Sequence, residues 1–132
     1  MAAWSTVHTN RFKVAVIGAG IVDWIAWNGV TIYNDMMFYY FGGPFWNNPQ
    51  LWFDRSPIRY VKNARTPTLI QAGGADKIVP ISQAYQWYHA LRATHVPVNM
   101  LIYTKQGHNF SDPNMIVIGL KDLQQWLKHY LG

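Results

Sequence analysis

The sequence predicts an α/β fold built on a small parallel sheet. In the second half of the chain, short apolar runs alternate with amphipathic helical patterns in the order strand, helix, strand, helix. This alternation is typical of βαβ units, whose consecutive strands run parallel. A further β-branched run lies nearer the N-terminus, and 132 residues are enough for a single domain, 1–132, with a buried core.

The first half of the chain predicts one helix end and one strand before an irregular region. Residues 1–9 have the character of the last turns of a helix, and residues 13–18 (KVAVIG) form a β-branched run typical of a buried strand. An aromatic stretch, 21–53, follows and is interrupted by Gly, Pro and Asn pairs. We expect only short helices within it, over 35–41 and 49–53.

The second half predicts two strands, each followed by a helix. The strands are 68–72 (TLIQA) and 98–103 (VNMLIY), and the first helix covers 81–94. Its expected apolar face consists of Ile81, Ala84, Tyr85, Tyr88 and Leu91. Asp112 is the expected N-cap of the final helix, with Pro113 at its first position. The expected apolar stripe of that helix consists of Ile116, Leu120, Leu123, Leu127 and Tyr130.

Composition excludes several classes of protein. The formal charge is +5, but the eleven Lys and Arg residues are scattered, so we expect no nucleic-acid partner. There is no cysteine, and no segment reaches the roughly 20 apolar residues of a membrane span. The N-terminus lacks the apolar core of a signal peptide. We therefore expect no membrane association and a cytoplasmic location.

In a parallel sheet, functional groups gather in the loops at the carboxyl ends of the strands. The first such loop contains Gly18-Ala19-Gly20, which looks like a dinucleotide-binding turn. Asp23 stands where the third glycine of that fingerprint belongs, and no acid closes a second strand about 20 residues on, where a ribose contact is expected. A dinucleotide-dependent oxidoreductase is therefore a remote alternative, and we expect no cofactor.

The second and third loops carry an acid and a histidine. Asp76 follows the strand 68–72, and His108 follows the strand 98–103, with one helix between them. In α/β-hydrolases the acid and the histidine follow the nucleophile in this order, on loops at strand ends. Histidine shuttles a proton, and a buried carboxylate holds its tautomer. On pattern alone, Asp76 could equally be a turn residue and His108 a surface residue. No two histidines have the i,i+4 spacing of a zinc site, so we expect no metal.

Four segments resemble the prolyl oligopeptidase family of serine peptidases, in particular its acylaminoacyl-peptidase and dipeptidyl-peptidase branches. They are RFKVAVIGAGIVDW, FGGPFWNNPQLWFDRSPIRYVKNARTPTLI, GGADKIVPISQAYQWYHALRATHVPVNMLIYTKQGHNF and DLQQWLKHYLG. The resemblance implies an α/β-hydrolase catalytic domain that hydrolyses short peptides, with Asp76 and His108 as the acid and base of a triad. It also implies that Ile21, Trp24 and Val79 face the substrate side chain.

The chain departs from this family in one respect. The family's nucleophile sits in a Gly-x-Ser-x-Gly turn, and none of the four serines, Ser5, Ser56, Ser82 and Ser111, has that context. The resemblance therefore implies the C-terminal half of an α/β-hydrolase domain, without the nucleophile half and the β-propeller. We expect such a chain to be inactive alone and to self-associate or pair with an upstream half of the same domain. A non-catalytic dimerising fragment or pseudoenzyme is the alternative.

Overall fold

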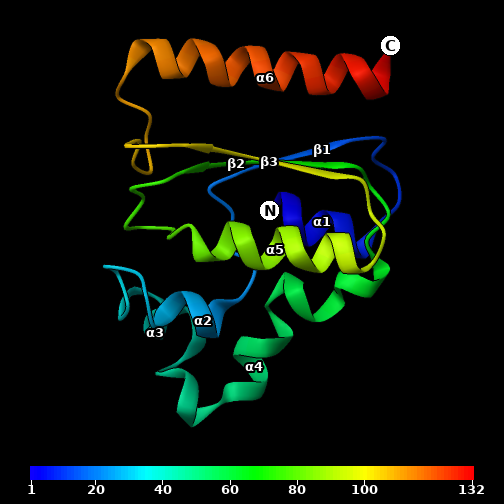
Figure 1. Cartoon of the computed structure of the whole chain (residues 1–132). Coiled ribbons are helices and arrows are strands. Elements are labelled where there is room, and N and C mark those ends of the chain that lie inside the picture. The colour runs from blue at the N-terminus through cyan, green and yellow to red at the C-terminus, as the bar shows by residue number, and fades with distance from the viewer.

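The computed structural model describes all residues, 1–132, and contains a three-stranded parallel sheet flanked by helices on both faces (Figure 1). The strands are β1 (Ala15–Gly18), β2 (Thr68–Gly73) and β3 (Val98–Tyr103), and they lie in the order β1-β2-β3. Both pairs are parallel, and the register aligns Ile17 with Ile70 and Ile70 with Met100. The predicted α/β class with a parallel sheet is confirmed.

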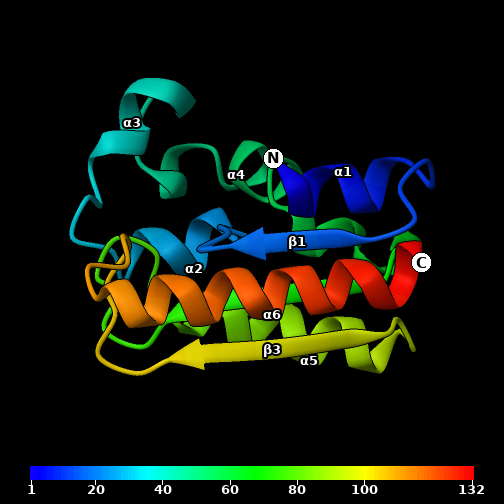
Figure 2. The same ribbon diagram turned by 90° about the horizontal axis from the view of Figure 1, so that it is seen from above.

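Helices cover the two faces of the sheet unequally. Figures 1 and 2 show that α6 (Pro113–Leu131) lies alone over one face. The opposite face is covered by α1 (Ala2–His8) and α5 (Ser82–Ala93). The shorter elements lie beyond α5, farther from the sheet (Figure 1). They are α2 (Trp24–Asn28), α3 (Met36–Phe41), η1 (Phe45–Asn47), α4 (Pro49–Asp54) and η2 (Pro57–Asn63).

Two apolar clusters form the core. The larger one lies between the sheet and the helices α1 and α5 and includes Ile17, Ile70, Trp87 and Leu91. The smaller one consists of Trp27, Met37 and Trp52 from the aromatic stretch together with Val79 from the loop after β2, with several partly buried aromatic residues around it. The stretch that looked irregular in sequence therefore has a core of its own.

The predicted face of the helix 81–94 is partly wrong. Ala84 and Leu91 are buried as expected, but Tyr85 is 42% exposed. Trp87 and the polar Gln83 are buried instead. The hydrogen bonds of Gln83 explain the shift, because its side-chain oxygen accepts from the backbone amides of two residues after β1 and so turns this face inward.

The predicted stripe of the final helix is also partly wrong. Ile116 and Leu120 are 41% and 59% exposed. The buried position of α6 is Gly119, where a Cβ would touch the side chains of Phe110, Gln71 and Tyr103 at 3.5–3.8 Å. A small residue brings α6 close to the sheet there, and polar bonds then set the rotation of the helix. The predicted cap is confirmed, since the Asp112 side chain accepts from the Asn114 amide at 2.8 Å.

None of the helices combines the length and the apolar content needed to cross a bilayer.

Candidate active site

The three loops singled out in the sequence meet at one edge of the sheet. Because β1, β2 and β3 are parallel, their carboxyl ends lie on the same side, as the arrowheads of β1 and β3 show in Figure 2. The loop after β2 carries Asp76 and the loop after β3 carries His108. The structure therefore brings the two predicted residues together from positions 32 residues apart in the chain.

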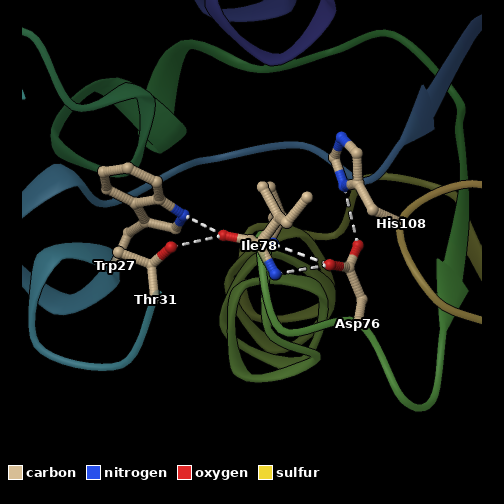
Figure 3. A network of polar contacts seen from close by, with 6 residues as sticks. Trp27, Thr31, Asp76, Ile78 and His108 are labelled. Carbon is tan, nitrogen blue, oxygen red and sulfur yellow. Dashed lines mark hydrogen bonds and ion pairs between the residues drawn. The ribbon is translucent and has the colours of Figure 1, made fainter. Parts of the chain in front are cut away.

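Asp76 and His108 form a hydrogen-bonded pair. His108 Nδ1 lies 2.9 Å from Asp76 Oδ2 (Figure 3). The Asp76 side chain is 1% exposed, whereas that of His108 is 35% exposed. The other carboxylate oxygen, Oδ1, accepts from the amides of Ile78 and Val79, each at 2.8 Å. Both carboxylate oxygens are therefore hydrogen-bonded, and the outer imidazole nitrogen, Nε2, makes no hydrogen bond within the chain.

The two loops are joined backbone to backbone. The Ala75 amide donates to the Gln106 carbonyl at 2.9 Å, and the Gly74 amide donates to the Tyr103 carbonyl at 3.0 Å. Gly73 makes this approach possible, because a Cβ there would lie 2.4 Å from the Gly107 carbonyl oxygen and 2.5 Å from that of Gln106. The distance between Asp76 and His108 thus depends on a residue without a side chain.

A buried glutamine shapes the histidine loop. Gln106 is 6% exposed, and its side-chain oxygen accepts from the amides of Ser111 and Asp112 at 3.1 and 3.3 Å. Lys105, just before it, has a left-handed φ of 67°, which turns the chain sharply after β3. Sequence reasoning missed Gln106, and an amide among loop residues gives no signal that would single it out.

A tyrosine network anchors α6 to the sheet beside this loop. Tyr103 donates to Asp122 Oδ2 at 2.8 Å and accepts from Gln71 Nε2 at 2.8 Å, and Gln71 also donates to the Gly119 carbonyl. Burial, together with the Asp122 carboxylate, raises the pKa of Tyr103 to about 12. The neutral phenol is therefore the stable form here. The ring also packs on Phe110, two residues after His108, with centroids 4.8 Å apart.

The loop after β1 does not resemble a phosphate cradle. Asp23 caps α2, since its Oδ1 accepts from the amides of Ile25 and Ala26, so these donors are already engaged. The amides of Val22 and Asp23 are bound by Gln83. The segment after Asp23 forms a helix of five residues only, α2.

An apolar cavity of about 520 Å³ adjoins His108. Its walls include Ile21, Trp24 and Val79, the three residues expected to face a substrate side chain. Val79 is also part of the smaller core cluster and is 7% exposed, so it belongs to both the core and the wall. The Trp24 indole is fixed by donating to the Arg55 carbonyl at 3.0 Å.

Other wall residues were not expected from the sequence. Trp27, Met36 and Ile78 line the same cavity, as do Met1 and Ala2 at the start of α1. They come from three separate segments of the chain, and no periodicity in the sequence shows that these segments meet. The start of α1 thus borders the same cavity as His108.

No hydrogen bond joins His108 to any of the four serines. The closest in sequence, Ser111, uses its amide to bind Gln106. Ser56 is fully buried, and its hydroxyl accepts from the Trp24 amide and donates to the Trp52 carbonyl. That hydroxyl is a structural bridge. No three or more His, Asp or Glu side chains gather in a geometry that could hold a metal ion.

Comparison with known proteins places these observations in a family. The model of the Prolyl oligopeptidase family matches residues 1–132. The acylamino-acid-releasing enzyme of Mus musculus is 32% identical over 132 residues, which cover 95% of this chain and 18% of that enzyme. The uncharacterized peptidase YuxL of Bacillus subtilis is 32% identical over 139 residues, covering 99% of this chain and 20% of that protein. The chain therefore spans about a fifth of the length of these relatives.

A solved structure agrees in fold. The uncomplexed acylaminoacyl peptidase of Pyrococcus horikoshii superposes with a TM-score of 0.91, covering 98% of this chain and 22% of that one at 20% identity. The similarity is to the α/β-hydrolase type of architecture, with a parallel sheet and flanking helices.

Proposed function

Because this chain belongs to the prolyl oligopeptidase family, we propose that it provides the base, the acid and part of the substrate pocket of a serine peptidase. The observation that supports this most directly is the pairing, at 2.9 Å, of a partly exposed imidazole with a buried carboxylate whose two oxygens are both hydrogen-bonded. A histidine with only a structural role would not need a free nitrogen facing an apolar cavity.

His108 would act as the general base and then as the general acid. Nδ1 is held by Asp76, so the proton of a neutral imidazole resides there and Nε2 is the acceptor. Nε2 would take the proton of a serine hydroxyl as that oxygen attacks a peptide carbonyl, and would return it to the leaving amine. Asp76 would stabilise the imidazolium formed between these steps, while the Ile78 and Val79 amides keep its carboxylate in place.

We propose that the nucleophile is a serine outside these 132 residues, held near the start of α1. Met1 and Ala2 line the same cavity as His108, so a residue placed just before α1 would face the imidazole. No Gly-x-Ser-x-Gly turn occurs within the sequence. The chain alone would therefore not form an acyl-enzyme, because histidine and aspartate only prepare a hydroxyl that another segment presents.

The cavity favours an apolar substrate side chain. Twelve of its fifteen lining residues are hydrophobic, and Trp24 contributes an immobilised aromatic wall. We infer that the substrate is a short peptide with an apolar residue before the scissile bond, of the acylaminoacyl- or dipeptidyl-peptidase kind. Trp24→Ala would change the preference among such residues more than it changes folding.

Active-site labelling tests the proposal. A serine-directed fluorophosphonate probe should label none of the four serines of the chain alone. It should label a Gly-x-Ser-x-Gly serine when a segment that carries this turn is joined ahead of residue 1, and His108→Ala should abolish this labelling. Stoichiometric labelling of Ser5, Ser56, Ser82 or Ser111 in the isolated chain would overturn the assignment of the nucleophile. Labelling of the joined serine that persists in His108→Ala would overturn the role of His108.

A further inference from the structure

One backbone carbonyl near the acid receives two side-chain hydrogen bonds. Trp27 Nε1 donates to the Ile78 carbonyl at 2.7 Å, and Thr31 Oγ1 donates to the same oxygen at 2.8 Å. Figure 3 shows the indole and the hydroxyl approaching this oxygen from the side opposite Asp76. A third bond, from the Ile32 amide to the Lys77 carbonyl at 3.1 Å, ties the same two segments together.

The carbonyl of Ile78 and the amide of Val79 belong to one peptide group. That group is planar and trans, so its C=O and its N–H point in opposite directions and cannot rotate independently. The Val79 amide donates to Asp76 Oδ1 at 2.8 Å. Whatever fixes the direction of the Ile78 carbonyl therefore also aims the Val79 amide at the carboxylate.

The two donors are protected from solvent. Trp27 is 1% exposed and Thr31 is 8% exposed, so water does not readily replace them at the carbonyl. Trp27 and Ile78 also line the apolar cavity beside His108. Trp27 thus lines the space expected to hold a substrate side chain and also binds the peptide group whose amide donates to Asp76.

We propose that Trp27 and Thr31 are positioning residues for the acid–base pair: by clamping the Ile78–Val79 peptide group, they hold the Asp76 carboxylate in register with His108. The clamp transmits a change at the cavity wall to Asp76. If the Trp27 side chain is displaced, its hydrogen bond to the Ile78 carbonyl is lost, and the Val79 amide in the same peptide group is no longer held toward the carboxylate. The consequence for turnover rests on the proposed peptidase function. The clamp itself does not.

Amide hydrogen exchange by NMR, together with the resonance of the His108 Nδ1 proton, tests the clamp in the 132-residue chain. Thr31→Val removes the donor to the Ile78 carbonyl, and with it the acceptor of the Tyr33 amide, and keeps the shape of the side chain. Exchange of the Ile78 and Val79 amides should become about fivefold faster, which corresponds to the net free energy of one ordinary hydrogen bond. The His108 proton should broaden or be lost, while amides in β2 and β3 keep their rates. Thr31→Ser, which keeps the hydroxyl, should restore both.

Two further variants separate positioning from general stability. Thr68→Val removes a hydroxyl that is fully buried and donates to the Thr66 carbonyl at 2.8 Å, at the opposite end of β2. It should leave the Ile78 and Val79 amides and the His108 proton unchanged. Trp27→Phe should reproduce Thr31→Val, whereas Trp87→Phe removes a buried indole N–H that has no partner and should not.

The clamp would be disproved if Thr31→Val left exchange at Ile78 and Val79 unaltered, or accelerated every amide equally. Failure of the peptidase proposal gives a different result. Without any serine labelling in the joined chain, the exchange measurements would still report the clamp, because they require no turnover.

Discussion

Replacing Gly73 with alanine should separate the two loops that carry Asp76 and His108. The added Cβ would lie 2.4 Å from the Gly107 carbonyl oxygen and 2.5 Å from the Gln106 carbonyl oxygen. Both obstacles are backbone atoms, so no side-chain rotation can relieve the contact. The histidine loop must therefore move as a unit, or β2 must bend at its last residue.

The size of the movement follows from the contact distances. The two oxygens would have to retreat by about 1 Å to reach an ordinary van der Waals separation of roughly 3.4 Å. The Asp76–His108 bond is 2.9 Å long, and the bond from Ala75 to Gln106 that joins the loops is also 2.9 Å long. A retreat of about 1 Å in the direction away from β2 would stretch both beyond hydrogen-bonding range, which ends near 3.2 Å. Overpacking of this kind typically costs about 1–3 kcal/mol of stability.

The assay combines urea unfolding with NMR detection of the His108 Nδ1 proton. Gly73→Ala should lower the free energy of unfolding by about 1–3 kcal/mol and should abolish the hydrogen-bonded proton signal. Gly107→Ala is the matched control, because Gly107 lies on the other side of the same contact, in the loop that carries His108, and a Cβ there has no neighbour within 4 Å. If Gly73→Ala unfolded at the same urea concentration as Gly107→Ala and retained the proton signal, the close approach of the two loops would not determine the distance between Asp76 and His108.

Three more outcomes are expected. Burial raises the pKa of Tyr103 from 10 to about 12 in the folded chain, so the stability that its neutral phenol contributes is present below pH 10 and is lost as the pH rises to 12. The free energy of unfolding should fall by up to about 2–3 kcal/mol in that window. Tyr103→Phe should remove this pH dependence. Gln83→Leu leaves the amides of Val22 and Asp23 unpaired in a buried site. It should lower the free energy of unfolding in urea by about 2–4 kcal/mol, whereas a change below about 0.5 kcal/mol would indicate that water takes the place of the Gln83 side chain. β1 pairs only with β2, so its other edge is open to pairing with a second chain. Sedimentation should detect self-association at tens of micromolar, and a clean monomer at that concentration would contradict this prediction.

The regular elements were predictable because their residues repeat with a period. The strand 98–103 was predicted with its observed bounds, and the strand 68–72 lacked only Gly73. The first strand begins two residues later than expected, at Ala15. Helix faces were less accurate, since Gln83 and Gly119 occupy buried positions that an apolar stripe does not identify. Hydrogen-bonding capacity and small size decide burial there, and neither enters a count of apolar residues.

The contact between Asp76 and His108 was predictable from topology. Parallel strands end at the same edge of the sheet, so an acid and a histidine at the ends of neighbouring strands must come close. The sequence could not show the close packing that sets their distance. That packing depends on Gly73 facing the carbonyls of another loop, and on Gln106 folding that loop upon itself. The first is a contact between segments more than 30 positions apart, and the second joins polar loop residues that no sequence pattern distinguishes.

The aromatic stretch 21–53 was the least predictable part of the chain, and the structure gives it a precise mechanical role. Its residues follow no single period because they serve two surfaces at once: Trp27 packs in the smaller core cluster, lines the cavity and also donates to the Ile78 carbonyl. A residue with three kinds of neighbour cannot be placed by a pattern that records only apolar against polar. The same multiplicity makes the stretch sensitive to change, because a substitution chosen to reshape the cavity at Trp27 would also release the peptide group that aims the Val79 amide at Asp76. Trp24 makes no hydrogen bond to that peptide group, since its indole donates to the Arg55 carbonyl, but its ring packs edge-on against Trp27 with centroids 5.5 Å apart. A substitution at Trp24 that keeps an aromatic ring should therefore change substrate preference with less effect on the acid–base pair than a change at Trp27, which should alter both together.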